Sequence, residues 1–280
     1  LSCVVVSQVD DDAKGKGMVR REISRIITPG VRYEGDGLDE KTYNYLASAV
    51  LNPRGAGTFA YVDVSTGHLH LEEVESPDEL IETFQRISPS ELIVPSAVYG
   101  VKVERGNGWV KDLKSAAKDV NCHIVPRPYE KADKSFLLER LNSMLPARKG
   151  LSSEQQQRFL SLTTETFSVV DTILNYVDEV SFGYAPRISN FQIDERQRIV
   201  FIDNATRRNL ELLQTRIDGE KKNSLVQHLD YSITPMGARL FKEWILSPSS
   251  NLTEIFARQD AVAALIFKDE VITFLRRSFA

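Results

Sequence analysis

Cysteine is scarce in this chain of 280 residues, where only Cys3 and Cys122 occur. Two cysteines without paired spacing exclude a disulfide framework and a structural zinc site. No apolar run approaches the ~20 residues that a membrane helix requires. We therefore expect a protein of the reducing cytoplasm, with no disulfide and no membrane segment.

An excess of positive charge is also absent. The formal net charge is -4 and the isoelectric point is about 5.7, which excludes a uniformly basic nucleic-acid coat. Any contact with DNA must then come from local patches. The candidates for contact with DNA phosphates are Arg207, Arg208, Lys221 and Lys222. A solvated helix surface is the alternative explanation for each of these two doublets.

Sequence motifs for reactive chemistry are missing as well. The glycine-containing stretch 30–35 is not followed by the Lys-Ser/Thr pair of a P-loop, and no serine sits in a nucleophile elbow. His68 and His70 share one face of a strand, but two ligands are too few for zinc. We therefore predict that this segment has no catalytic residue, no bound cofactor and no metal ligand, and that it is not an enzyme.

What the sequence does contain is a change of character along its length. Strand-like and helix-like stretches alternate in the first half, and the second half is nearly all helical. This pattern predicts an α/β domain with a sheet of about five strands, followed by an all-α domain. The predicted strands are 4–6, 23–27, 58–64, 69–71, 91–94 and 122–125, with a short one at 198–202. The predicted helices are 39–50, 77–87, 110–120, 134–141, one long helix from 152 to before 183, 205–215, 225–229, 236–246, 253–267 and 269–279.

Several helix starts carry capping signals. Ser76 precedes Pro77 and has a glutamate three residues on, and Asp203 or Thr206 is placed to cap the helix at 205. Thr234 precedes Pro235 in the same way. We expect Gly237 to permit close approach of a neighbouring helix, and we expect these residues to be structural.

The two ends of the sequence lack the usual signals. The chain opens without an initiator methionine, and it stops inside a helical pattern at Arg276–Ala280. We expect a piece of a longer protein, with apolar helix faces left exposed around Phe267, Phe274 and Phe279.

Three segments together resemble the MutS mismatch-recognition family. They are 17–30, then the hairpin 61–67, then 203–212 with Ser224-Leu225, 234–240 and Trp244. The family-signature residues, which we interpret as structural, are Asp63, Thr66, Gly67, Asp203, Thr206, Asn209, Thr234, Pro235, Met236 and Gly237. Phe241-Lys242-Glu243 matches the family's Phe-x-Glu wedge by letters only, and we expect it to pack inside a helix.

The resemblance implies a domain plan and a set of partners. Residues 1–30 would be the tail of the mismatch-binding domain with its linker, 31–128 a ribonuclease H-like connector domain, and 129–280 the first part of the helical core or lever domain. The segment would couple DNA binding to a distant ATPase and dock MutL. The full-length parent would use ATP and Mg²⁺, bind double-stranded DNA and form a homodimer.

Asp63 supports an alternative function. It lies on an early strand, where a carboxylate could bind Mg²⁺ in a two-metal ribonuclease H-like nuclease. That chemistry needs several converging carboxylates, whereas Glu72, Glu73 and Glu75 cluster at a strand end and the following loop. A structural aspartate near a turn is the preferred interpretation.

Overall fold

The computed structural model describes residues 2–8, 21–32, 39–99, 108–130, 132–146, 151–182, 188–193 and 199–279. Its contacts divide the chain into two compact units. The first comprises Leu1–Leu38 and Asn44–Asp194, and the second comprises Asp39–Tyr43 and Glu195–Ala280. Part of the 30–35 stretch lies outside the described residues. The first unit contains sheets and helices, and the described part of the second is helical, so the prediction of an α/β part followed by an α part is confirmed.

A mixed sheet forms the centre of the first unit. Within the described residues its strand order is β7-β6-β3-β4-β5-β8. The strands are β3 (Tyr45–Leu51), β4 (Gly57–Asp63), β5 (His68–Val74), β6 (Glu91–Pro95), β7 (His123–Arg127) and β8 (Asn190–Ile193). β3, β4 and β5 pair antiparallel, β6 runs parallel to β3 and to β7, and β8 runs parallel to β5. At the start of β4 a side chain on Gly57 would place Cβ 1.9 Å from the Val50 carbonyl, so only glycine fits.

The predicted helix at 39–50 is wrong, because its second half is strand β3. Leu46, Ala47, Ser48 and Ala49 are all buried, since β3 lies inside the sheet and both of its faces are covered. A strand buried on both faces shows a continuous apolar run without alternation, and such a run also fits a helical spacing.

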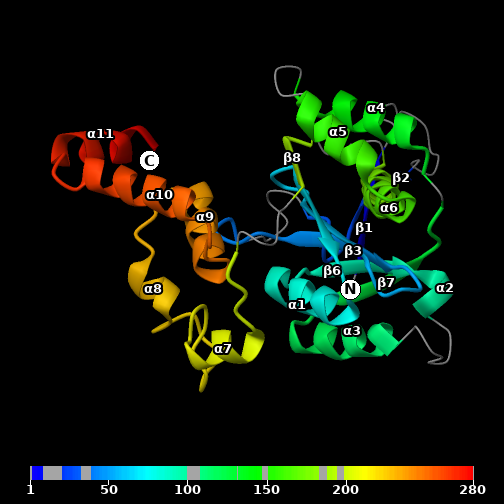
Figure 1. The fold of residues 1–280 in the computed structure, drawn as a ribbon, viewed down its shortest axis with the longest axis horizontal. Helices are drawn as coiled ribbons and strands as arrows, with labels where there is room; N and C mark the ends of the chain where they lie inside the picture. Colours follow the sequence, from blue (N-terminus) through cyan, green and yellow to red (C-terminus); the bar gives the residue numbers. More distant parts are fainter. Residues whose placement is uncertain are drawn as a thin grey trace, which may run out of the picture. The chain divides into compact units, whose positions relative to one another are not determined.

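Helices cover both faces of this sheet (Figure 1). On one face lie α1 (Pro77–Ile87) and α3 (Gly108–Asp119), with the short α2 (Ser96–Tyr99) at the end of β6. On the other lie α4 (Lys134–Met144), α5 (Ser153–Ser161) and α6 (Thr164–Ser181), with α6 running along β3 and β4. Each face buries its own apolar cluster, so the unit is a three-layer α/β/α structure.

The long helix predicted from 152 is two helices. Ser152 starts α5 with a capping box that includes Gln155, and Thr163 adopts an extended conformation and starts α6. The break lets Phe159 fold back against Phe167, with ring centroids 4.8 Å apart. Because α6 covers the sheet, the first compact unit continues to Asp194, beyond residue 128 where the connector domain was expected to end.

A separate two-stranded hairpin precedes the main sheet. It pairs β1 (Cys3–Gln8) with β2 (Arg21–Ile27) in antiparallel register, with a bulge between Val5 and Val6. β2 packs against α6. The intervening residues 9–20 are not described.

The second unit is built of helices, with a long connection, residues 210–224, between the first two. The helices are α7 (Asn204–Asn209), α8 (Leu225–Leu229), α9 (Pro235–Leu246), α10 (Leu252–Leu265) and α11 (Asp269–Phe279). The helix predicted at 205–215 is shorter than expected, and in the described part of the strand predicted at 198–202 Ile199 makes a single bridge to Ser249. No helix among the described residues has the length and apolar character needed to cross a bilayer.

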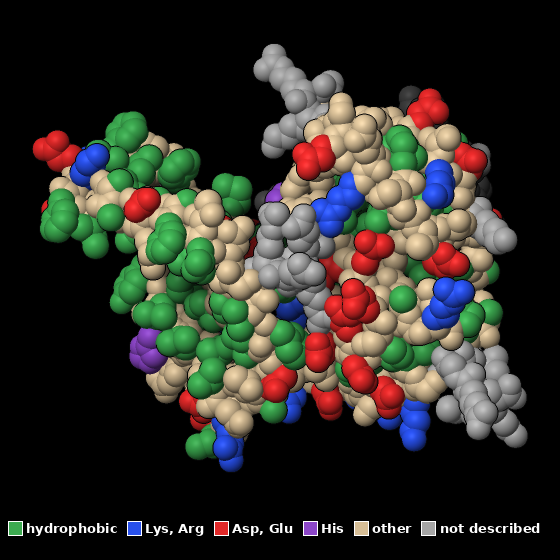
Figure 2. Space-filling view, in the orientation of Figure 1, with side chains coloured by type: hydrophobic (Ala, Val, Ile, Leu, Met, Phe, Trp, Pro, Cys, Tyr) green, Lys and Arg blue, Asp and Glu red, His purple; other side chains and the backbone are tan. Residues whose placement is uncertain are grey.

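Apolar side chains are widely exposed on this unit. Figure 2 shows them gathered over α9, α10 and α11. Phe267, Phe274 and Phe279 are 92%, 67% and 63% exposed, as expected from the sequence. Leu240 and Trp244 of α9 are also exposed, at 43% and 40%.

Candidate functional site

Asp63 at the end of β4 organises the turn into β5. One carboxylate oxygen accepts hydrogen bonds from the Ser65 N–H and hydroxyl, at 2.9 and 2.6 Å, and from the Thr66 N–H at 3.2 Å. The other accepts from the Asn44 N–H at 3.1 Å. The Gly67 N–H donates to the Asp63 carbonyl, and Gly67 adopts the positive φ of 72° that favours glycine. The three signature residues of this hairpin thus form one closed turn.

Groups of its own chain surround the Asp63 carboxylate. The side chain is buried, and both of its oxygens are occupied by groups of its own chain. Within the described ranges, no group of three or more His, Cys, Asp or Glu side chains is placed to hold a metal ion. His68 and His70 are the histidines of this hairpin that the sequence analysis considered as zinc ligands. The His70 ring stacks on the Tyr61 ring, with centroids 4.8 Å apart.

Most signature residues of the second unit lie at two helix starts. Asp203 accepts the Thr206 N–H at 2.6 Å and caps α7, and this bond lowers the pKa of Asp203. Thr234 accepts the Gly237 N–H at 3.1 Å and caps α9, with Pro235 at the first turn. The remaining two signature residues are Asn209, the last residue of α7, and Met236, which is exposed.

Gly237 is crowded by its own cap and not by a neighbouring helix. The nearest atoms to a Cβ added there belong to Thr234, at 3.1 Å, and Ser232, at 3.5 Å. The expected close approach of a second helix is therefore replaced by a tight helix start.

The four basic candidates differ in their surroundings. The Arg207 guanidinium donates to the carbonyls of Ile202 and Leu246, at 2.9 and 3.3 Å, so it braces the unit. The Lys221 ammonium pairs with Asp39 at 2.6 Å. Arg208 and Lys222 are exposed. Lys221 is exposed as well, but its ammonium is paired with Asp39, so Arg208 and Lys222 are the better placed of the four for phosphate contact.

A cluster of basic side chains holds the segment Asp39–Tyr43 inside the second unit. In addition to the Lys221 pair, the Arg239 Nε donates to the Glu40 carbonyl at 2.6 Å. The Lys242 ammonium donates to the Lys41 carbonyl at 2.6 Å and to the Thr42 hydroxyl at 2.9 Å. Lys221 lowers the pKa of Asp39 to about 2, and burial lowers the pKa of Lys242. Lys242, from the wedge-like triplet, therefore serves a contact within the protein.

Glu91, buried at the start of β6, anchors the segment that precedes the sheet. One carboxylate oxygen accepts from the Thr28 hydroxyl at 2.5 Å and the Gly30 N–H at 2.9 Å, and the other accepts from the Tyr176 hydroxyl at 2.8 Å. Burial and then the Glu91 charge raise the pKa of Tyr176. One carboxylate thus joins the pre-sheet segment, β6 and α6.

A second buried carboxylate, Glu72 on β5, binds Arg86 of α1 and also accepts from the Tyr61 hydroxyl at 3.2 Å. Sequence reasoning placed Glu72 in a strand-end cluster and missed this pair. The position of Glu72 between Leu71 and Val74, two apolar residues of one strand, is the sequence signal for a buried carboxylate at this place.

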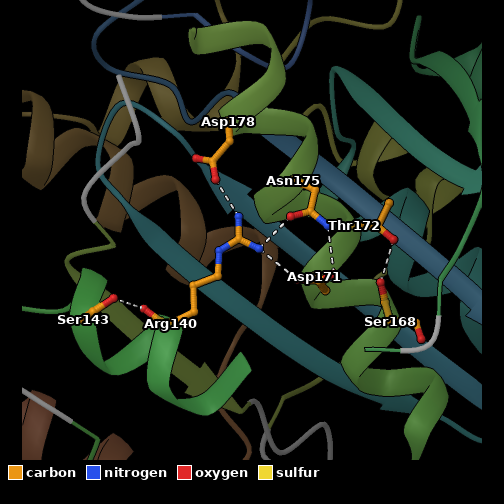
Figure 3. A network of polar contacts seen from close by, with 7 residues as sticks. All are labelled: Arg140, Ser143, Ser168, Asp171, Thr172, Asn175 and Asp178. Atoms are coloured by element: carbon orange, nitrogen blue, oxygen red, sulfur yellow. Dashed lines mark hydrogen bonds and ion pairs between the residues drawn. The ribbon is translucent and has the colours of Figure 1, made fainter. Parts of the chain in front are cut away.

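Arg140 of α4 binds three hydrogen-bond acceptors on α6 and so joins the two helices (Figure 3). Its guanidinium donates to Asp171 at 2.9 Å, Asn175 at 2.7 Å and Asp178 at 2.6 Å. The three acceptors are spaced four and three residues apart, so they lie on one face of α6. The sequence contains this pattern, but the sequence analysis did not identify it. Burial raises the pKa of the Cys122 thiol to about 12, which disfavours the thiolate, the nucleophilic form, at neutral pH.

Comparison with known proteins identifies the relatives of this chain. The sequence pattern described as MutS domain II matches residues 44–184, half of the chain. The chain belongs to the MutS family. The pattern described as MutS domain III matches residues 205–280. The domain II match ends beyond residue 128, in agreement with the extent of the first compact unit.

Individual MutS relatives match along nearly the whole sequence. The DNA mismatch repair protein MutS of Thermosynechococcus vestitus is 30% identical over 277 residues, covering 98% of this chain and 30% of the relative. The proteins of the same name from Myxococcus xanthus and Desulforapulum autotrophicum are 28% and 32% identical, covering 99% and 94% of this chain. The chain therefore spans about 30% of the length of a MutS relative.

Proposed function

We propose that this chain is the connector and the first part of the helical core of a DNA mismatch-recognition protein. Its role is to couple DNA binding to an ATPase elsewhere in that protein. The observation that carries the proposal is the order of the two matches, domain II and then domain III, in relatives named as DNA mismatch repair proteins. ATP and Mg²⁺ act, in this proposal, through parts of the protein outside these 280 residues.

The proposed mechanism is mechanical. Glu91, Glu72 and Arg140 each cross-link different elements of the first unit, which favours movement of that unit as one body. Coupling between distant sites requires elements of this kind, which change arrangement without losing internal packing. The mixed sheet with helices on both faces supports a ribonuclease H-like connector, and the occupied oxygens of Asp63 favour a connector without nuclease activity.

Partners follow from the same proposal. The whole protein is proposed to be cytoplasmic, to bind double-stranded DNA, to form a homodimer and to dock MutL, with the first unit contributing to the MutL surface. Arg208 and Lys222 are the proposed phosphate contacts, because both are exposed. Arg207 and Lys221 would contribute less, since each is engaged within the protein.

A titration tests the proposal. The purified 280-residue chain is mixed with a paired duplex and with the same duplex carrying one mismatch, at several stated salt concentrations. We expect no preference for the mismatch, no ATP turnover, and residual binding that weakens steeply with salt. In the whole protein, Arg208→Gln with Lys222→Gln is expected to weaken duplex binding equally for both duplexes. Mismatch preference or ATP hydrolysis by the isolated chain contradicts the assignment, as does Mg²⁺-dependent cutting that Asp63→Asn abolishes.

A further inference from the structure

Two consecutive residues of the chain belong to different compact units. Tyr43 closes the short segment Asp39–Tyr43 of the second unit, and Asn44 opens the main part of the first unit. β3, which lies within the sheet, begins at the next residue. A single peptide bond therefore joins a segment fixed in one unit to a strand fixed in the other.

The segment Asp39–Tyr43 is held on the second unit by several contacts. Lys221 pairs with the Asp39 carboxylate, and Arg239 donates to the Glu40 carbonyl. Lys242 donates to the Lys41 carbonyl and to the Thr42 hydroxyl. The Arg239 guanidinium also lies over the Tyr43 ring, 5.7 Å from its centroid. Charged donors on backbone carbonyls make stronger hydrogen bonds than neutral donors.

The segment is also ordered from within. The Asp39 carboxylate accepts from the Lys41 N–H at 3.0 Å and from the Thr42 hydroxyl at 3.1 Å, and the Asp39 carbonyl accepts from the Thr42 N–H at 2.9 Å. The segment Asp39–Tyr43 is therefore an ordered turn and not a flexible linker.

On the other side of the junction, Asn44 is fixed by three contacts. Its N–H donates to Asp63, its side-chain N–H donates to the Pro29 carbonyl at 3.0 Å, and its side-chain oxygen accepts from the Ser90 hydroxyl at 2.7 Å. Asn44 thus links the signature turn at Asp63 to the Thr28–Gly30 segment that Glu91 anchors.

We propose that Lys221, Arg239 and Lys242 clamp the turn Asp39–Tyr43, so that a displacement of the second unit is transmitted through Tyr43 and Asn44 to the start of β3. The inference rests on the proposed coupling function and gives it a physical location. The turn is fixed on the second unit, and the residue that follows it, Asn44, is fixed in the first. Such a direct connection transmits displacement that a flexible linker would absorb.

Hydrogen exchange of the 280-residue chain, without DNA or nucleotide, tests the clamp. The test variant is Arg239→Met with Lys242→Met, which keeps an unbranched apolar side chain at both positions and removes the two charged donors. The matched control is Lys268→Met with Arg277→Met, which removes two exposed charges from the same unit. We expect exchange at Lys41 and Thr42 to accelerate by about tenfold or more in the test variant. The amides of 44–46 are expected to accelerate as well, and the control to match the parent chain.

The reciprocal variant completes the test. Because coupling is reciprocal, Asn44→Ala is expected to accelerate exchange at Lys41 and Thr42 across the junction. A rescue variant, Arg239→Met with Lys242→Arg, retains a charged donor at position 242. We expect it to restore the protection of Lys41 and Thr42 that the test variant loses. Unchanged exchange in α10 verifies that the second unit stays folded.

Unchanged exchange at 44–46 in the clamp variant, or at 41–42 in Asn44→Ala, overturns the inference. Equal acceleration throughout α9 and α10 overturns it too, because it indicates general destabilisation of the second unit. The duplex titration does not bear on these rates, so failure of the clamp and failure of the proposed function are distinguishable.

Discussion

Arg86 of α1 binds the Glu72 carboxylate of β5 inside the interface between that helix and the sheet. The two side chains are 5% and 2% exposed, so the pair is cut off from water. Burial lowers the pKa of Arg86, but the Glu72 charge outweighs this and raises it, so the Arg86 guanidinium stays charged.

We expect Arg86→Met to destabilise the chain by about 3–5 kcal/mol, because it leaves the Glu72 carboxylate buried without its cation. The double variant Glu72→Leu with Arg86→Met removes both charges and is expected to recover most of that loss. Urea unfolding of the parent, both single variants and the double variant measures the coupling energy. A double variant less stable than Arg86→Met contradicts this explanation.

Thr83 in α1 offers a route to a more stable chain. Its side chain is fully buried, and its hydroxyl has no hydrogen-bond partner among the residues that the structure describes. Thr83→Val replaces the hydroxyl by a methyl group of similar size, and we expect a gain of up to about 1 kcal/mol. Thr58→Val is the control, since that buried hydroxyl bonds Thr166 at 2.8 Å and its loss is expected to destabilise. Thermal unfolding compares the two, and a loss at Thr83 equal to that at Thr58 would disprove the prediction.

Gly30 is expected to tolerate no side chain. A Cβ there would lie 2.7 Å from the Glu91 Cβ, and the same residue's N–H is bound by the Glu91 carboxylate. We expect Gly30→Ala to cost about 1–3 kcal/mol through overpacking. Gly108→Ala is the matched control, because no atom of the described residues lies within 4 Å of a Cβ at Gly108. Equal urea midpoints for the two variants would show that the pre-sheet segment moves freely to make room.

The Asp39 carboxyl predicts an acid-dependent loss of stability. Lys221 lowers its pKa from 3.8 to about 2, so its contribution is present above pH 4 and is lost as the pH falls toward 2. The effect is expected to be small and salt-sensitive, since the Asp39 side chain is 46% exposed. Thermal midpoints of the parent and Asp39→Asn, measured at low salt, should differ at pH 5 and converge at pH 2. A constant difference across that range rules out a role for this ionisation.

Local signals in the sequence located many elements correctly. Ser76, Asp203 and Thr234 each accept an N–H at the helix start that their sequence predicted, because capping depends only on neighbouring residues. The hairpin at Asp63 and Gly67 was located for the same reason, since its turn is closed by the residues that form it. Strand β3 was mistaken for a helix, because burial on both faces removes the alternation on which recognition of a strand depends.

The sequence by itself determined the α/β then α order, the helix caps, the absence of a disulfide framework and the resemblance to MutS proteins. These depend on residue type and local spacing. Tertiary structure alone decided which distant side chains meet: Glu72 with Arg86, Arg140 with three acceptors on α6, and Lys242 with the carbonyl of Lys41. Pairs such as Lys41 and Lys242 are far apart in the chain, so their meeting depends on how whole elements pack, and no local pattern encodes it.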